Sequence, residues 1–218
     1  VAEAINAEGG SAESAEVDAL DEAAVRAHAD AVAAQAGRID ISFNAISIFG
    51  HLQGTRLIDM NSADVLTPIT AGVRTHLFTG VAAARHMVSQ GSGVILTLSS
   101  TGAHLSGRDQ MEHSAGGFGI ACTAIEALSR TLAAELGPKG IRVVCLRSEA
   151  IPETWPAAPE HAELVREIKA YMTAGTILGR MTTLAEVANA AAFAASDRAS
   201  AISGAIMNLT CGSVMDAD

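Results

Sequence analysis

The apolar run at residues 94–98, VILTL, constrains the fold of this chain more than any other stretch. Its apolar side chains do not alternate with polar ones, which predicts a strand buried on both faces, as in a parallel sheet. The run ends in Ser99 and Ser100, and a loop rich in glycine, serine and charged residues leads from there into a long helical pattern. Ligands of open parallel sheets bind beyond the carboxyl ends of the strands, so we expect Ser100 to lie at a ligand site.

Helical and strand patterns alternate along the rest of the chain. We predict helices over residues 21–35, 63–90, 113–136, 160–173 and 184–195, and strands over residues 39–44, 94–98, 141–146 and 205–209, with a weaker strand candidate at residues 15–19. Acidic residues at the start of a helix and glycine after its end support these boundaries. The βαβ order predicts an α/β fold, a three-layer Rossmann-type doubly wound parallel sheet, in a single domain over residues 1–218.

The acidic balance of the chain, a formal net charge of −10, argues against a nucleic-acid partner or an anionic membrane surface. No apolar run reaches the ~18 residues of a membrane-spanning helix, and the first residues lack the pattern of a signal peptide. The three cysteines form no CxxC pair, which is typical of reduced cysteines in a core. We therefore expect a cytoplasmic protein, and the spacing of the histidines predicts no metal site.

Several segments together resemble one protein family. Residues 37–41, GRIDI, resemble the segment that leads into the family's fourth strand, and residues 133–143, AAELGPKGIRV, closely resemble the link before its sixth strand. Residues 179–180 and 186–188 resemble the segment before its last strand. The chain is thereby similar to the short-chain dehydrogenases/reductases. The resemblance implies an NAD- or NADP-dependent oxidoreductase that acts on the hydroxyl or carbonyl group of a small-molecule substrate.

The catalytic motif of that family is altered in this chain. The family carries a serine after the central strand and a Tyr-x-x-x-Lys pair at the start of the next helix, with the tyrosine usually thirteen residues after the serine. Counting from Ser100 places His113 at the tyrosine position and Gly117 at the lysine position. Free histidine titrates near pH ~6.5, so Ser100 and His113 form a candidate acid–base pair that needs no lysine. The alternative is that His113 is a polar residue beside an inactive site.

The cofactor-binding segments depart from the family as well. Its Asn-Asn-Ala-Gly turn is Asn44-Ala45-Ile46-Ser47 here, its Pro-Gly after the sixth strand is Ser148-Glu149, and Gly72 stands where it places a proton-relay asparagine. Glu149 would bring a negative charge to the cofactor site. The resemblance implies cofactor contacts from Asp18, Ala19, Asn44, Ala45, Ile46, Leu98, Ser148, Ile151 and Thr154.

The glycine-rich Thr-Gly-x-x-x-Gly-x-Gly turn of the family does not occur in the sequence. We therefore expect a sheet that lacks the family's first two strands, and the choice between NAD and NADP stays open. Two functions remain: an oxidoreductase with a degenerate site, or a non-catalytic binding or assembly subunit. Both predict a homodimer or homotetramer through the helices at residues 63–90 and 113–136, which carry small and apolar residues at helical spacing.

Overall fold

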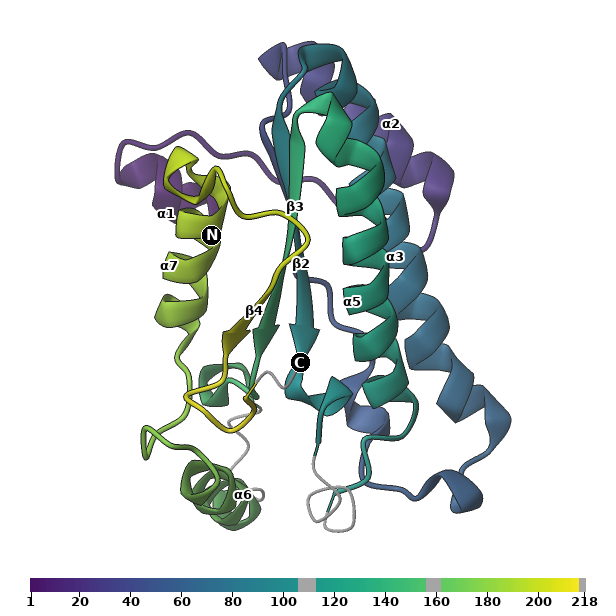
Figure 1. Ribbon diagram of the computed structural model, residues 1–218, viewed down its shortest axis with the longest axis vertical. Helices are drawn as coiled ribbons and strands as arrows, with labels where there is room; N and C mark the ends of the chain where they lie inside the picture. Colours follow the sequence, from purple (N-terminus) through teal and green to yellow (C-terminus); the bar gives the residue numbers. More distant parts are fainter. Residues whose placement is uncertain (106–112, 156–161, 216–218) are drawn as a thin grey trace.

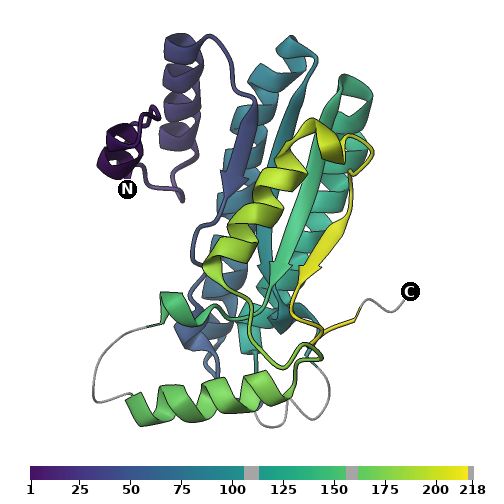
Figure 2. The same ribbon diagram turned by 90° about the vertical axis from the view of Figure 1, so that its left-hand side faces the viewer.

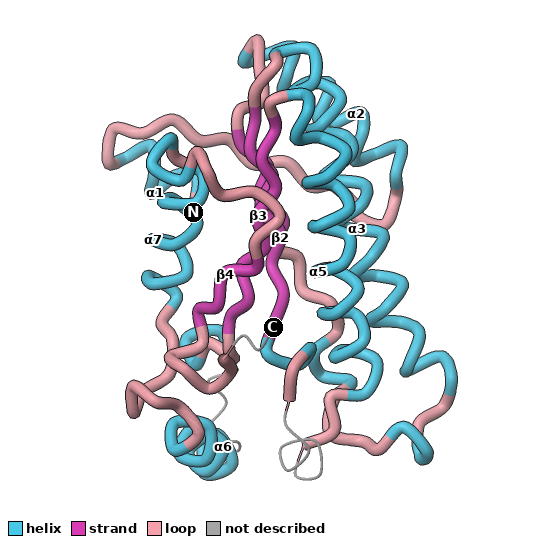
Figure 3. The backbone as a smooth tube through the Cα atoms, in the orientation of Figure 1, coloured by secondary structure: helices cyan, strands magenta, loops and turns pink. Residues whose placement is uncertain are grey.

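The computed structural model describes residues 1–105, 113–155 and 162–215. At its centre lies a parallel sheet whose four strands follow the order of the sequence. Figure 3 draws the strands in magenta between the helices. The strands are β1 (Ile41–Asn44), β2 (Gly93–Ser100), β3 (Ile141–Ser148) and β4 (Ile206–Leu209). Each neighbouring pair is parallel, which confirms the prediction made from the βαβ order.

Helices cover both faces of this sheet. The described helices are α1 (Ala2–Ala7), α2 (Glu22–Ala36), α3 (Ser62–Gln90), α5 (Gly116–Leu136), α6 (Ala162–Ala174) and α7 (Leu184–Ala195). Helices α3 and α5, with α2 outside them, lie on one face and α7 lies on the other (Figure 1). The three-layer Rossmann-type fold is thereby confirmed. None of the described helices is long and apolar enough to cross a membrane.

The two central strands are buried on both faces. Ile95 and Val143 pack with α3 and α5, whereas Leu96 and Val144 pack with α7, and all four side chains are at most 1% exposed. This packing explains why the run at residues 94–98 shows no alternation of apolar and polar residues.

Local chemistry fixes the ends of the helices. The Asp21 side chain accepts hydrogen bonds from the first turn of α2, and Asn61 caps α3 in the same way. Gly37 and Gly91 end these two helices in left-handed conformations. Thr183 and the third residue of α7, Glu186, form a reciprocal capping box.

Two predicted elements differ from the structure. Residues 15–19 form no strand; Asp18 is exposed and its carboxylate accepts the Leu20 N–H in a turn, so this strand prediction was wrong. The helix predicted from residue 113 begins at Gly116 instead. The φ angle of Gly116 is +52°, so the right-handed helix does not extend backward into the residues before it. The helix predicted over residues 160–173 is α6, and residues 160 and 161 lie outside the described part of the chain.

Helix α5 approaches α3 closely at Gly117. A Cβ atom on Gly117 would lie 2.0 Å from the Val65 carbonyl oxygen, which belongs to the α3 backbone. Because a backbone atom cannot move aside as a flexible side chain can, no side chain is accommodated at position 117. A lysine of the family motif would therefore not fit there, and Gly117 is a packing residue between two helices.

We expect Gly117→Ala to destabilise the fold by about 1–3 kcal/mol, because the added methyl group forces α5 away from α3. Gly80→Ala within α3 is the matched control: a Cβ there would meet its nearest neighbour, Leu132 Cδ1, at an ordinary contact distance of 3.4 Å. That change should be neutral or stabilising by up to about 1 kcal/mol. Urea unfolding followed by circular dichroism measures both, and equal stability of the two variants would contradict the packing interpretation.

Candidate functional site

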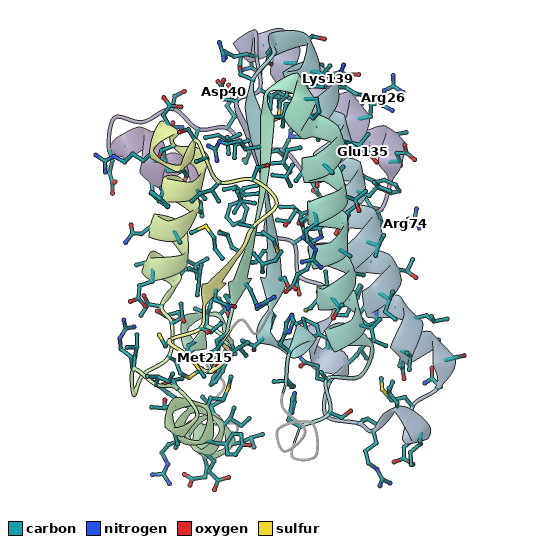
Figure 4. All side chains as sticks on the ribbon, viewed as in Figure 1. Arg26, Asp40, Arg74, Glu135, Lys139 and Met215 are labelled. Atoms are coloured by element: carbon teal, nitrogen blue, oxygen red, sulfur yellow. The ribbon has the colours of Figure 1, made fainter. Side chains whose placement is uncertain are left out.

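The carboxyl ends of the parallel strands form one edge of the sheet, the lower edge in Figures 1 and 2. Ser100 at the end of β2 is paired in register with Ser148 at the end of β3, and Asn44 at the end of β1 is paired with Thr97. The structure therefore brings together three of the segments that the sequence analysis assigned to a ligand site. Met215 lies toward this end, whereas Asp40 and Lys139 lie toward the opposite end (Figure 4).

Asn44 ends β1 in a turn held by its own side chain. Its Nδ2 donates to Thr79 Oγ1 at 2.9 Å, and its Oδ1 accepts the Ile46 N–H at 3.0 Å. Asn44 is 4% exposed, while Ala45 and Ile46 are exposed. The Asn44 side chain thus shapes the turn, and the residues after it present the surface that a ligand could contact.

The two serines after the central strand have different surroundings. Ser99 is buried, and its hydroxyl donates to Glu126 Oε1 at 2.9 Å. Ser100 is half-buried, and its hydroxyl accepts the Gly102 N–H at 3.4 Å, capping the single turn η3 (Thr101–Ala103). Ser100 keeps the position that the sequence predicted, at the open edge of the sheet.

His113 is not paired with Ser100. It lies before α5, its side chain is exposed, and its Nε2 forms a 3.3 Å hydrogen bond with Gln53 Oε1. No hydrogen bond between His113 and Ser100 occurs in the described part of the chain. The candidate acid–base pair is therefore not assembled, because the loop before α5 places His113 against a different segment.

The first turns of α5 pack against the segment at residues 99–102 through Phe118 and Cys122, which are four residues apart. The Phe118 ring lies against Gly102, where a Cβ would come within 3.0 Å of it. Cys122 is fully buried and its carbonyl oxygen accepts from Ser99 Oγ at 3.3 Å. Burial raises the pKa of the Cys122 thiol to about 12, so the thiol stays protonated at neutral pH.

The remaining predicted cofactor residues lie in three different places. After β3, the half-buried Ile151 precedes the short turn η5 (Pro152–Thr154), and the exposed Thr154 is the last residue of that turn. Leu98, also half-buried, packs with the core under α7. Asp18 and Ala19 lie in an irregular segment before α2 and form no part of the sheet, which corrects their expected place at the end of a strand.

A buried ion pair lies beneath the same edge, and sequence reasoning missed it. Arg147 on β3 donates from Nε to Glu126 Oε1 at 2.7 Å and from Nη2 to Glu126 Oε2 at 2.8 Å. Both side chains are at most 3% exposed. His104 Nε2 lies 3.2 Å from Glu126 Oε2, and Arg147 Nη1 donates to Asn208 Oδ1 at 2.8 Å. Two features of the sequence could have indicated this ion pair: Glu126 lies within an otherwise apolar helix, and Arg147 lies at the end of a buried strand.

The Glu126 carboxyl is ionised in this cluster. Burial raises its pKa, but the hydrogen bonds from Arg147, His104 and Ser99 outweigh burial and hold the pKa below its ordinary value. Among the residues that the structure describes, no group of histidine, cysteine and acidic side chains could hold a metal ion.

Glu149 is buried next to this edge, and none of the ion pairs between described residues includes it. It follows Ser148, is 5% exposed, and its Oε2 has no hydrogen-bond partner among the described residues. Burial raises the pKa of this carboxyl to about 7, against a smaller opposing effect of Ser213. The expected negative charge at this position is therefore only partly present at neutral pH and is largely absent below it.

Glu149 should make the protein less stable as the pH rises. The unfolded carboxyl, with a pKa near 4.5, releases its proton before the folded one, whose pKa is about 7, so stability falls between these values. The loss is about 3 kcal/mol by pH 8, since each pKa unit corresponds to ~1.4 kcal/mol. Glu149→Gln should remove this loss, whereas the exposed Glu135→Gln should not. Urea unfolding at pH 5 and pH 8 measures it, and an unchanged pH dependence in Glu149→Gln would refute the assignment.

Comparisons with known proteins agree with this architecture. The family described as Enoyl-(Acyl carrier protein) reductase matches residues 1–213. The chain is 31% identical over 200 residues to cis-4-hydroxycyclohexanecarboxylate dehydrogenase of Sinomonas cyclohexanicum, covering 89% of this chain and 74% of that protein. It is 32% identical to galactitol 2-dehydrogenase of Rhizobium johnstonii, covering 71% of this chain. The crystal structure of sorbitol-6-phosphate 2-dehydrogenase from Erwinia amylovora superposes with a TM-score of 0.84 at 26% identity, covering 99% of this chain and 85% of that one.

The match spans 58% of the galactitol dehydrogenase, less than two thirds of its length. All three of these similar proteins are named as dehydrogenases.

Proposed function

Because the chain belongs to the short-chain dehydrogenase/reductase family, we propose that it acts with NAD or NADP on the hydroxyl or carbonyl group of a small-molecule substrate. The observation that carries the proposal is the position of Ser100, at the carboxyl edge of a parallel sheet and in register with Ser148. That edge is where such sheets bind ligands. The similar proteins named above are dehydrogenases of hydroxylated compounds, which supports a substrate of this class.

The described residues fit part of a nicotinamide dinucleotide. The turn after Asn44 exposes its backbone at the end of β1, and Ser148 and Ile151 follow the end of β3. Because the pKa of Glu149 is raised to about 7, its carboxyl is mostly neutral below that pH and would repel a phosphate-bearing ligand at this edge less than an ordinary carboxylate does. When bound, the cofactor would supply or accept the hydride. The residues of this chain would bind and orient the substrate and transfer the proton.

Catalysis at this site is weaker than in relatives that carry the Tyr-x-x-x-Lys pair. Counted from Ser100, the positions of the pair hold His113 and Gly117. Judged by the start of α5, they hold Phe118 and Cys122 instead. A protonated thiol cannot provide the positive charge of a lysine. This loss favours a second candidate function, a non-catalytic binding or assembly subunit of the same family.

Nicotinamide binding separates the two functions. We expect NADH or NADPH to bind the full-length protein with an increase in nicotinamide fluorescence, and slow turnover with small polyols or hydroxy acids. Binding without any turnover would favour the assembly subunit, and absence of binding to both cofactors would contradict the proposal.

Two single substitutions in the same assay test which residue replaces the family's tyrosine. If the tyrosine position of the family is the one at the start of α5, Phe118→Tyr should raise kcat at least tenfold, because it restores a phenol there. In that case His113→Tyr should have no effect. If the spacing from Ser100 sets it, the outcome is reversed.

We also propose that the chain forms a homodimer or homotetramer through α3 and α5. Ile120 on α5 is 45% exposed, and Leu66 and Val88 on α3 are 55% and 41% exposed, so apolar side chains remain uncovered on both long helices. Ile120→Glu should shift the protein toward the monomer in light scattering after gel filtration. Ile168→Glu on α6, which is 41% exposed, is the matched control and should leave the assembly intact. A monomeric wild-type protein would overturn this proposal.

A further inference from the structure

His104 lies at the carboxyl edge of the sheet, immediately after the turn η3 that Ser100 caps. Its backbone N–H donates to Thr101 O at 2.8 Å, which fixes the residue four positions from Ser100. The side chain is 45% exposed, so one end of the ring reaches solvent. Ring atom Nδ1 forms no hydrogen bond with any residue in the described ranges.

The other end of the ring contacts the buried ion pair. Nε2 lies 3.2 Å from Glu126 Oε2 and 2.9 Å from Arg147 Nη2. The Glu126 carboxylate can accept a hydrogen bond from Nε2 only when Nε2 carries a proton. The Arg147 guanidinium can donate a hydrogen bond to Nε2 only when Nε2 carries none. If Nδ1 is the atom that takes up and releases a proton, Nε2 must keep its own proton and donate it to Glu126. This is the arrangement of a carboxylate–histidine dyad.

Glu126 is held in place by groups on two strands, β2 and β3. Ser99 at the end of β2 donates to Oε1, and Arg147 on β3 donates to both oxygens. The ion pair is itself tied to β4, since Arg147 donates to Asn208. A buried carboxylate with this many donors has a fixed orientation, so it fixes the ring that it binds.

We propose that His104 is the proton-transfer residue of this site, with Nδ1 as the acid–base atom and with Glu126 and Arg147 as positioning residues. The inference rests on the proposed oxidoreductase function. In the oxidation of an alcohol, the hydroxyl proton passes to Nδ1 while the two electrons leave with the hydride to the oxidised nicotinamide, and a carbonyl forms. In reduction the protonated ring returns that proton to the carbonyl oxygen.

This arrangement is absent around His113. That residue contacts the neutral Gln53 amide, and no acidic side chain is bonded to its ring among the described residues. The two histidines therefore provide a matched comparison: each side chain is exposed, and among the described contacts only His104 is bonded to a buried carboxylate.

Turnover of His104→Gln and His113→Gln tests the inference. We expect His104→Gln to lower kcat about 100-fold with KM changed less than about twofold, since general acid–base groups contribute ~10²–10⁴ in rate. His113→Gln should keep wild-type kcat. An active wild-type protein whose His104→Gln variant turns over equally well overturns this inference alone. A wild-type protein that neither binds NADH nor turns over overturns the proposed function, and the proton-transfer role with it.

A second measurement needs no activity. Nitrogen-15 NMR of the full chain with labelled histidine distinguishes the two neutral tautomers, and the His104 signals are those missing in His104→Gln. We expect the proton on Nε2 in the wild type. In the double variant Glu126→Leu/Arg147→Met, which removes both buried charges together, this preference should be lost and kcat should fall at least tenfold. A proton on Nδ1 in the wild type, with Nε2 accepting from Arg147, would overturn the proposal.

Discussion

The parallel pairing of β2 with β3 is the contact on which the rest of the structure depends. Eight residue pairs stay in register from Gly93 with Ile141 to Ser100 with Ser148. Both strands are buried by α3 and α5 on one face and by α7 on the other, so neither can shift by one residue without exposing its core side chains. The same register places the polar ends of both strands together at one edge.

Charged groups are expensive to bury at that edge, and the Glu126–Arg147 pair is held by several hydrogen bonds. Glu126 and Arg147 are removed from water, and each isolated charge would cost several kcal/mol in such a place. The bidentate contact, together with Ser99 and Asn208, compensates for this cost and links α5 to three strands. Glu149 has no such partner among the described residues, and burial raises the pKa of its carboxyl to about 7 instead.

The start of α5 is set by backbone geometry rather than by spacing from Ser100. Gly116 adopts a left-handed conformation, and Gly117 lies against the Val65 carbonyl, so the helix begins where two glycines allow it. A loop can gain or lose residues between a strand and a helix without changing either one. Counting residues from Ser100 was therefore a weak guide to the residue that faces the serines, and the structure separates His113 from Ser100.

The sequence by itself determined the layers and most of the boundaries of the fold. Buried strands such as residues 94–98 and caps such as Thr183 depend on contacts near in the chain or on a pattern that recurs along it, and both can be read from one sequence. The sequence also identified Ser100 as an edge residue. The tertiary structure alone decided which charged groups meet: Glu126 and Arg147 are 21 residues apart in the chain, and His104 and Glu126 are 22 apart. Such contacts depend on how a helix lies across a sheet, which no local pattern encodes.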